Sequence, residues 1–230
     1  MNKVGWIIFS AAVVALIAGL VIWTKATNPT TEIGDVNANA IIAANDQNGN
    51  IGDHTLGNIE SKVVFTEYGD FQCPSCGGAH PQVKSLMEEY NEKIVFIFRN
   101  FPITQIHPNA RAAAAAAESA GLQGKYWEMH DALFEGQNVW GTLDTNQRTE
   151  FFKGYAKELK LDEEKFATDL ASANVGKKIS FDQALGTKIG VNSTPAFFVN
   201  GTKVTGEAAE NIVRGDATAM KKLIDEALAK

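Results

Sequence analysis

The chain has 230 residues, of which 45% are hydrophobic and 21% are charged, a composition that is ordinary for a globular protein and excludes disorder throughout. This length suits one domain of good size with appendages and is short for two large domains. The formal net charge of −6 and the lack of a dense Lys/Arg cluster in the sequence argue against a nucleic-acid partner.

The first element is an apolar stretch. Residues 4–23 carry no charge, and as a helix rising about 1.5 Å per residue they would match a hydrocarbon core of roughly 30 Å. Trp6 and Trp23 lie near its two ends, where indole rings favour the membrane interface. We expect a transmembrane anchor over 1–23. A cleaved signal peptide is the main alternative, although the residues that follow make a poor cleavage site, and a buried globular helix is the other.

A polar segment comes next. Residues 24–52 are rich in Asn, Thr, Ala and Gly, which predicts a linker. Within it, residues 46–50 place oxygen-bearing side chains at alternate positions, as a calcium loop does, but Gly57 stands where such a loop needs its last glutamate ligand. We therefore interpret this run as an Asn/Gly-rich turn.

The folded domain is expected from residue 53 to residue 230. Residues 62–68 are β-branched and aromatic and predict a strand, residues 74–90 have helical apolar spacing, and residues 94–99 form a continuous apolar run typical of a buried strand. Strand, helix and strand make a βαβ unit, because two parallel strands need such a crossover. Pro81 predicts a kink or a broken first turn in the helix.

Helices dominate the middle of the chain. We expect them at 108–120, with Pro108 at the first helical position and Gly121 just past the end, and at 125–134, 147–159, 162–171 and 174–189. Two short strands, 196–199 and 203–205, then flank Asn200-Gly201, a strong hairpin signal, and a helix at 218–229 ends the chain. The order is βαβ, then an all-helical insertion at about 107–172, then ββα.

Cys73 and Cys76 are the only cysteines, and they lie at the junction of the first strand and its helix. A disulfide that closes two intervening residues adds little stability, so the pair is placed for chemistry. A zinc site would need four ligands, and only His80 among the histidines is near, so we expect no metal here. His80 itself is expected on the helix surface, with a role in tuning the thiols as the alternative.

A helix that starts at Cys73 would activate its thiol. If Cys73 is the N-cap, Pro74 takes the first helical position, where its missing N–H costs nothing. The backbone N–H groups of Ser75 and Cys76 then point at the Cys73 sulfur. Lowering a thiol pKa from about 8.5 to about 5 requires roughly 4.8 kcal/mol, of which the helix dipole supplies at most about 2 and hydrogen bonds the rest. Cys76, inside the helix, is expected to be the buried resolving thiol.

These residues resemble a known family. Residues 71–76, FQCPSC, are similar to the active-site stretch of the DsbA-like branch of the thioredoxin superfamily. The resemblance extends to Glu67 six positions earlier, to residues 99–102 and 107–111 ahead of the insertion, and to Ser-Thr-Pro at 193–195. It implies an α/β thioredoxin-like fold with an all-helical insertion, here preceded by a transmembrane helix.

The resemblance also implies roles for individual residues. Glu67 would be a buried carboxyl of raised pKa that takes the proton of Cys76 through water as that thiol attacks; a solvated charge on an edge strand is the alternative. Thr194 and Pro195 would form a cis-proline loop that docks an extended substrate strand, and an ordinary trans turn is the alternative. DsbA itself has a histidine where this chain has Ser75, so we expect a less stabilised thiolate and a less oxidising disulfide.

The function implied is that of an extracytoplasmic thiol–disulfide oxidoreductase, anchored in the cell membrane by a single helix. We place the domain outside because disulfides persist there. Its redox centre would be the Cys73–Cys76 disulfide with no other cofactor, its substrates reduced extracytoplasmic proteins, and its reoxidase a quinone-linked membrane partner of DsbB-like or VKOR-like type. A disulfide reductase or isomerase kept reduced by a membrane electron donor is the alternative, and a metal-binding or chaperone-like module is a third hypothesis.

Overall fold

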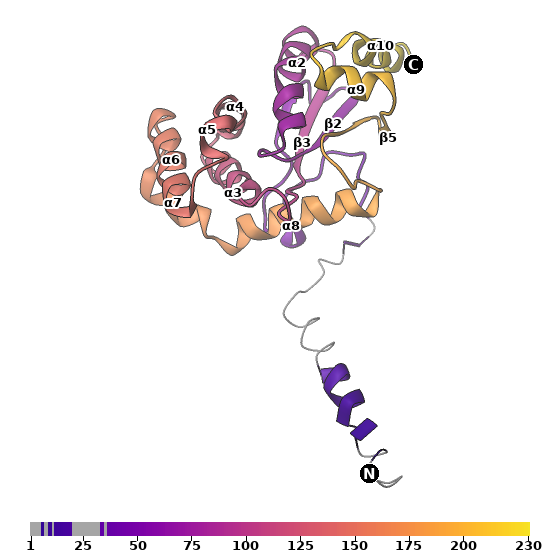
Figure 1. The fold of residues 1–230 in the computed structure, drawn as a ribbon. Coiled ribbons are helices and arrows are strands. Elements are labelled where there is room, and N and C mark those ends of the chain that lie inside the picture. The colour runs from indigo at the N-terminus through magenta and orange to yellow at the C-terminus, as the bar shows by residue number, and fades with distance from the viewer. Residues whose placement is uncertain (1–5, 7–8, 11, 20–32, 35) are drawn as a thin grey trace. The chain divides into compact units, whose positions relative to one another are not determined.

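The computed structural model describes residues 6, 9–10, 12–19, 33–34 and 36–230 (Figure 1). The chain divides into two units, and the second runs from residue 33 to the carboxyl end. In the first unit, the described residues between 6 and 19 are helical. Among the residues described, no helix is both long and apolar enough to cross a membrane. The anchor expected over 1–23 lies partly outside the described residues.

A five-stranded sheet organises the second unit. Its strands are β1 (Thr55–Gly57), β2 (Val64–Gly69), β3 (Val95–Asn100), β4 (Ala196–Val199) and β5 (Thr202–Lys203). The spatial order is β1-β3-β2-β4-β5, with β2 and β3 parallel and the other pairs antiparallel. Helix α2 (Pro74–Tyr90) connects β2 to β3, as the sequence predicts, and it continues through Pro81 without a break in its helical assignment. Because β2 is the middle strand, other strands pair with both of its edges, and all but the first of its residues are buried.

The remaining helices fall into an insertion and a carboxyl-terminal part. They are α3 (Ala110–Gly121), α4 (Tyr126–Glu135), α5 (Gln137–Trp140), α6 (Thr145–Glu158), α7 (Glu163–Leu170), α8 (Ala173–Lys188), α9 (Glu207–Val213) and α10 (Thr218–Leu228). Helices α3 to α7 form a lobe beside the sheet, and α8 returns the chain beneath it (Figure 1). The expected thioredoxin-like architecture with a helical insertion is therefore confirmed. The sequence did not predict α5 and α9, because they are too short to show a clear apolar period.

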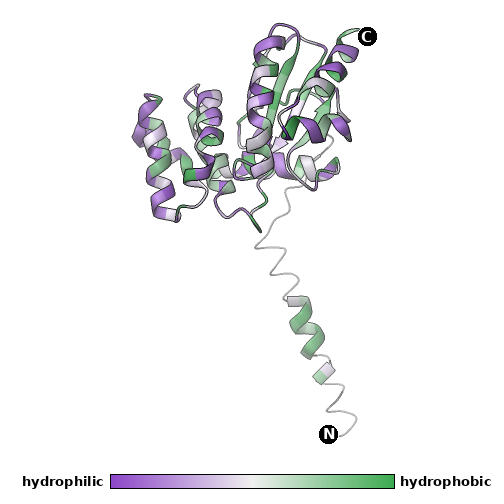
Figure 2. Ribbon diagram, turned by 45° about the horizontal axis from the view of Figure 1, so that its top comes forward, coloured by the Kyte–Doolittle hydropathy of each residue, from purple (hydrophilic) through white to green (hydrophobic). Residues whose placement is uncertain are grey.

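The sheet is covered on both faces, and alternation along β2 decides which side chains meet which helices. Phe65 packs in the same buried cluster as the apolar side of α2 and α10. Tyr68 lies on the opposite face, against α8, where a Cβ at Gly186 would come within 2.9 Å of its ring. Apolar strands enclosed by helices with polar outer faces are visible in Figure 2. Since neighbours along a strand point to opposite faces, Glu67 shares the α2 side with Phe65.

The compact unit begins earlier than the sequence indicated. Ile42 and Ile51 are buried, although both lie in the segment expected to be a linker up to residue 52. The fully buried Arg99 guanidinium donates to the carbonyl oxygen of Ala40 at 2.8 Å and to the Asp53 carboxylate at 2.7 Å. An arginine with five donors can hold a chain segment in this way only when the fold brings backbone carbonyls to it. The turn expected at 46–50 is a capped 3₁₀ helix, η1 (Asp46–Asn48).

Candidate active site

Cys73 lies at the amino end of α2, in an extended conformation, with φ −70° and ψ 121°. Its backbone N–H donates to the carbonyl oxygen of Asp70 at 3.0 Å, which closes a tight turn after β2. Pro74 takes the first helical position, where a proline ring suits the helix and its missing N–H has no partner to lose. The expected N-cap placement of Cys73 is thus confirmed.

The two sulfur atoms differ in their surroundings. Both cysteines are free thiols; Cys73 is 7% exposed and Cys76 is fully buried. The pKa of Cys73 is lowered to about 5, chiefly because the Cys76 thiol donates a hydrogen bond to it, with burial opposing and smaller contributions from the backbone N–H groups of Cys76 and Ser75. The pKa of Cys76 is raised well above its ordinary value by burial, and next by that same hydrogen bond. The Cys73 thiol is therefore the more acidic of the two, and the Cys76 thiol stays protonated.

The main donor to Cys73 differs from the one expected. The sequence argument relied on the helix dipole and on backbone N–H groups, whereas the largest contribution comes from the second thiol. Backbone N–H groups can be counted from a helix start, but the direction of a thiol depends on its packing. The Cys76 sulfur is held in turn by the backbone N–H of Asp70 at 3.5 Å.

Glu67 lies on the middle strand, between Phe98 of β3 and Phe197 of β4. Its side chain is buried, and burial followed by the negative charge of Cys73 raises its pKa to about 8. Within the described part of the chain, its Oε1 has no hydrogen-bond partner. The alternative of a solvated charge on an edge strand is therefore wrong, because β2 is the middle strand, with two strands on each side of it, and Glu67 is buried. At neutral pH the group is mostly a neutral carboxylic acid.

The loop before β4 closes the site from the other side. The peptide bond between Thr194 and Pro195 is cis, as the resemblance implied. The Cys73 sulfur lies 3.4 Å from the carbonyl oxygen of Thr194, although 121 residues separate them in sequence. The Thr194 hydroxyl is buried without a partner among the described residues. A backbone carbonyl and a free hydroxyl thus lie beside the reactive sulfur.

Two glutamines that the sequence did not mark as site residues join the turn at Cys73 to the helical insertion: Gln137 in the insertion and Gln72 in the turn. The side-chain amide of Gln137, in α5, donates to the carbonyl oxygens of Phe71 at 2.7 Å and Cys73 at 2.9 Å. Gln72 donates to the carbonyl oxygen of Gly141 at 2.9 Å and accepts from a backbone N–H of the α3 start at 2.6 Å. Gln72 could have been suspected from its place next to the motif, whereas no sequence signal marks Gln137.

The Asp70 carboxylate contacts three groups around the turn at Cys73. One of its carboxylate oxygens accepts the backbone N–H of Gln72, and the other accepts the backbone N–H of Ile103, both at 2.8 Å. The second oxygen also lies 2.8 Å from Nδ1 of His107. The residues 107–111 that carried the resemblance therefore begin at a contact with the cysteine turn.

His80 is not on the surface, contrary to expectation. It is 7% exposed because helix α4 packs across this side of α2, where His80 stacks on Phe134 with ring centroids 5.0 Å apart. The sequence placed it on a helix and could not show which face the insertion would cover.

The site thus combines a low-pKa thiol at a helix start, a buried second thiol three positions later and a buried carboxylic acid on the preceding strand, which are groups that thiol–disulfide exchange can use. The Thioredoxin family model matches residues 49–225, more than half of the chain. The chain therefore belongs to the thioredoxin family.

Several solved structures are similar. A thioredoxin-like oxidoreductase from Silicibacter pomeroyi DSS-3 is 27% identical, with a TM-score of 0.64, and the match covers 85% of this chain and 99% of that one. BdbD from Bacillus subtilis is 22% identical with a TM-score of 0.64, covering 84% and 100%. Wolbachia pipientis alpha-DsbA1 is 21% identical with a TM-score of 0.63, covering 77% and 91%. The expected DsbA-like resemblance is confirmed at the level of the fold, an α/β thioredoxin-like domain with a helical insertion.

Curated relatives match in sequence over a shorter stretch. The Na(+)/H(+) antiporter NhaA 1 of Salinispora arenicola is 40% identical over 154 residues, which is 67% of this chain and 22% of that protein. The Na(+)/H(+) antiporter NhaA 3 of Salinispora tropica is 38% identical over the same lengths. The chain thus spans less than a quarter of these relatives, and ion transport is a property of those proteins.

Proposed function

We propose that the protein oxidises thiol pairs in extracytoplasmic proteins, with its Cys73–Cys76 disulfide as the oxidant. The observation that supports this direction is the low pKa of Cys73, about 5. A stabilised thiolate favours the reduced enzyme, so the disulfide accepts electrons more readily. Two pH units between this pKa and pH 7 stabilise the reduced form by roughly 2.7 kcal/mol, which corresponds to about 60 mV for a two-electron couple.

The reaction runs in two exchanges. A substrate thiolate attacks the Cys73 sulfur of the disulfide, the enzyme S–S bond breaks, and Cys76 leaves. Glu67, mostly protonated at neutral pH, supplies the proton that the buried Cys76 sulfur takes up. A second substrate thiolate then attacks the substrate sulfur of the mixed disulfide, and Cys73 leaves as a stable thiolate. Two electrons pass to the enzyme, and the substrate gains one disulfide.

The loop of Thr194 and Pro195 docks the substrate. An extended peptide can pair its backbone with the Thr194 main chain, which places a substrate cysteine beside Cys73. Main-chain pairing is independent of sequence, so we propose a broad range of unfolded protein substrates.

The place of action and the reoxidase are part of the same proposal. The uncharged apolar run at 4–23 supports a single-pass anchor in the cell membrane with the domain outside, where disulfides persist. A quinone-linked membrane enzyme of DsbB-like or VKOR-like type would reoxidise the pair, and no further cofactor is required. A reductase or isomerase is the second candidate, because Ser75 offers the Cys73 thiolate no positive charge.

Two measurements test the direction and the roles. Equilibration with glutathione gives the reduction potential: a value nearer the roughly −120 mV of DsbA supports the oxidant, and one near thioredoxin's roughly −270 mV supports the reductase. With a reduced protein substrate, Cys73→Ser should abolish oxidation. In Cys76→Ser, the Cys73 thiolate can attack a disulfide already present in an oxidised protein substrate, one substrate sulfur leaves as a thiolate, and the mixed disulfide should accumulate on non-reducing electrophoresis because no second enzyme thiol resolves it. If Cys76→Ser carries no linked substrate, the assignment of attacking and resolving thiols is wrong.

A further inference from the structure

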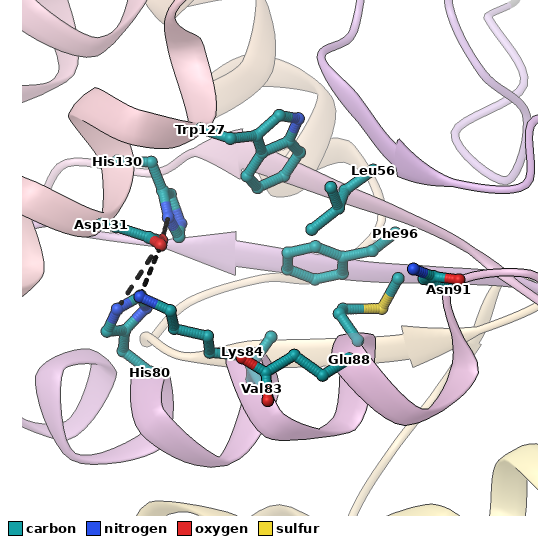
Figure 3. Close-up of a pocket in the computed structure, with 11 residues that line it drawn as sticks. Leu56, His80, Val83, Lys84, Glu88, Asn91, Phe96, Trp127, His130 and Asp131 are labelled. Carbon is teal, nitrogen blue, oxygen red and sulfur yellow. Dashed lines mark hydrogen bonds and ion pairs between the residues drawn. The ribbon is translucent and has the colours of Figure 1, made fainter. Parts of the chain in front are cut away.

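A second group of polar side chains lies apart from the cysteine pair, between α2 and α4. His80 of α2 and His130 and Asp131 of α4 meet at one end of an apolar pocket of about 240 Å³ (Figure 3). One nitrogen or oxygen atom from each side chain lies within 4.8 Å of the other two. Lys84 of α2 also reaches Asp131, at 2.8 Å, and Glu135 at 3.1 Å.

The two histidines are not satisfied as core residues. Both are buried, and in the described part of the chain Nε2 of each has no hydrogen-bond partner. Aromatic rings surround them: Phe134 stacks on His80, and the rings of Phe98 and Trp127 meet His130 edge-on, with centroids 4.8 and 5.1 Å away. Buried polar atoms almost always have a partner, so Nε2 of His80, which is unpartnered among the described residues and lies 3.8 Å from Oδ1 of Asp131, indicates a missing ligand.

Burial disfavours the charged form of both imidazoles. Burial, with a smaller contribution from the neighbouring His130, lowers the pKa of His80 to about 4. Burial also lowers the pKa of His130, although Asp131 opposes it. Imidazole binds metals in its neutral form, which burial favours for both rings.

The distances fit a small divalent metal. Metal–nitrogen and metal–oxygen bonds of about 2.0–2.2 Å place tetrahedral ligand atoms roughly 3.3 Å apart. Nδ1 of His130 and Oδ1 of Asp131 are 3.2 Å apart. Nε2 of His80 is 3.8 Å from the same oxygen, and the three ligand atoms all lie within 4.8 Å of one another, so side-chain adjustments of up to about 1.5 Å complete the set. Lys84 contacts the other carboxylate oxygen, so Oδ1 faces the two imidazoles.

We propose that His80, His130 and Asp131 bind a divalent transition metal of the zinc type, with water in the fourth position. Two imidazoles and a carboxylate are the donors that zinc takes in such sites. The metal ties the helix that starts at Cys73 to the helical insertion. Lys84 weakens the site, because its charge repels the cation and its ammonium group competes for Asp131.

The test uses the full chain with its disulfide formed, so that Cys73 and Cys76 cannot bind the metal. Zinc binding is measured by titration calorimetry, and cobalt(II) reports the ligand field through its visible absorption. We expect one metal per chain, and we expect His80→Gln or His130→Gln to weaken binding on the order of 100-fold. His54→Gln removes one histidine outside the cluster, where it contacts Glu118, and should leave binding unchanged.

Lys84→Met provides an outcome of opposite sign. Lys84 is partly exposed, so this variant keeps the fold, and removing its charge should tighten zinc binding by about tenfold. Asp131→Asn, also partly exposed, should weaken binding even if a variant of either buried histidine fails to fold. The proposal is overturned if the wild-type chain binds no zinc or cobalt. Binding that persists in the His80, His130 or Asp131 variants, or that does not tighten in Lys84→Met, also overturns it.

Discussion

Replacing Glu67 by glutamine tests the buried acid directly, because glutamine mimics its neutral form. The folded protein holds the pKa of Glu67 at about 8, against 4.5 for an ordinary glutamate. A proton therefore binds more tightly to the folded state, and the wild-type protein loses stability as pH rises from 4.5 through 8. Glutamine does not titrate, so the variant escapes this loss.

The size of the effect follows from the pKa. At 1.36 kcal/mol per unit, the variant should be more stable than the wild type by about 0.8 kcal/mol at pH 5 and by roughly 3 kcal/mol at pH 7. The difference should level off near 5 kcal/mol above pH 8, where Glu67 is ionised in both states. A constant offset from the new amide group would shift all values equally and leave the slope unchanged.

The assay is urea unfolding of both proteins at pH 5, 7 and 8.5 with a reductant present. Both chains keep Cys73, so its thiol titrates in both curves, and its charge interaction with Glu67 is part of the difference that is measured. Glu88→Gln, an exposed position on α2, is the matched control and should differ from the wild type by less than about 0.5 kcal/mol at each pH. If the stability difference for Glu67→Gln is the same at pH 5 and pH 8.5, the carboxyl titrates normally and cannot serve as the proton donor.

Three further predictions concern the cysteine turn. Iodoacetamide should modify Cys73 with a half-maximal rate near pH 5 while Cys76 stays unreactive in the folded protein, and a midpoint at or above pH 8 would contradict the hydrogen-bonding scheme. Ser75→His should raise the reduction potential by roughly 30–60 mV, the equivalent of one charge-assisted hydrogen bond of about 1.5–3 kcal/mol; an unchanged potential would show that this side chain does not act on Cys73. Gln137→Ala should lower the unfolding free energy by about 1–3 kcal/mol, since two carbonyl oxygens of the turn lose their donor, and unchanged urea curves would rule this out.

Interactions between residues close in sequence made the central helix and the strands around it predictable. The helix expected at 74–90 has those bounds in the structure, because a proline at its start and a regular apolar spacing act within a few residues. The strands around it were predicted within two residues, since buried parallel strands read as apolar runs. The short span between Cys73 and Cys76 predicted a redox pair without any knowledge of the fold.

Only the tertiary structure decided what surrounds that pair. Glu67 has a raised pKa because other strands and α2 enclose it, and Thr194 reaches Cys73 across 121 residues of sequence. The burial of His80 and the contact of Gln137 with the cysteine turn depend on where the insertion packs. Sequence periodicity shows that a helix has an apolar side, but neither it nor local spacing shows which distant element will cover each side chain. Burial and long-range contacts set the pKa values and the ligand geometry, so these emerged only from the folded chain.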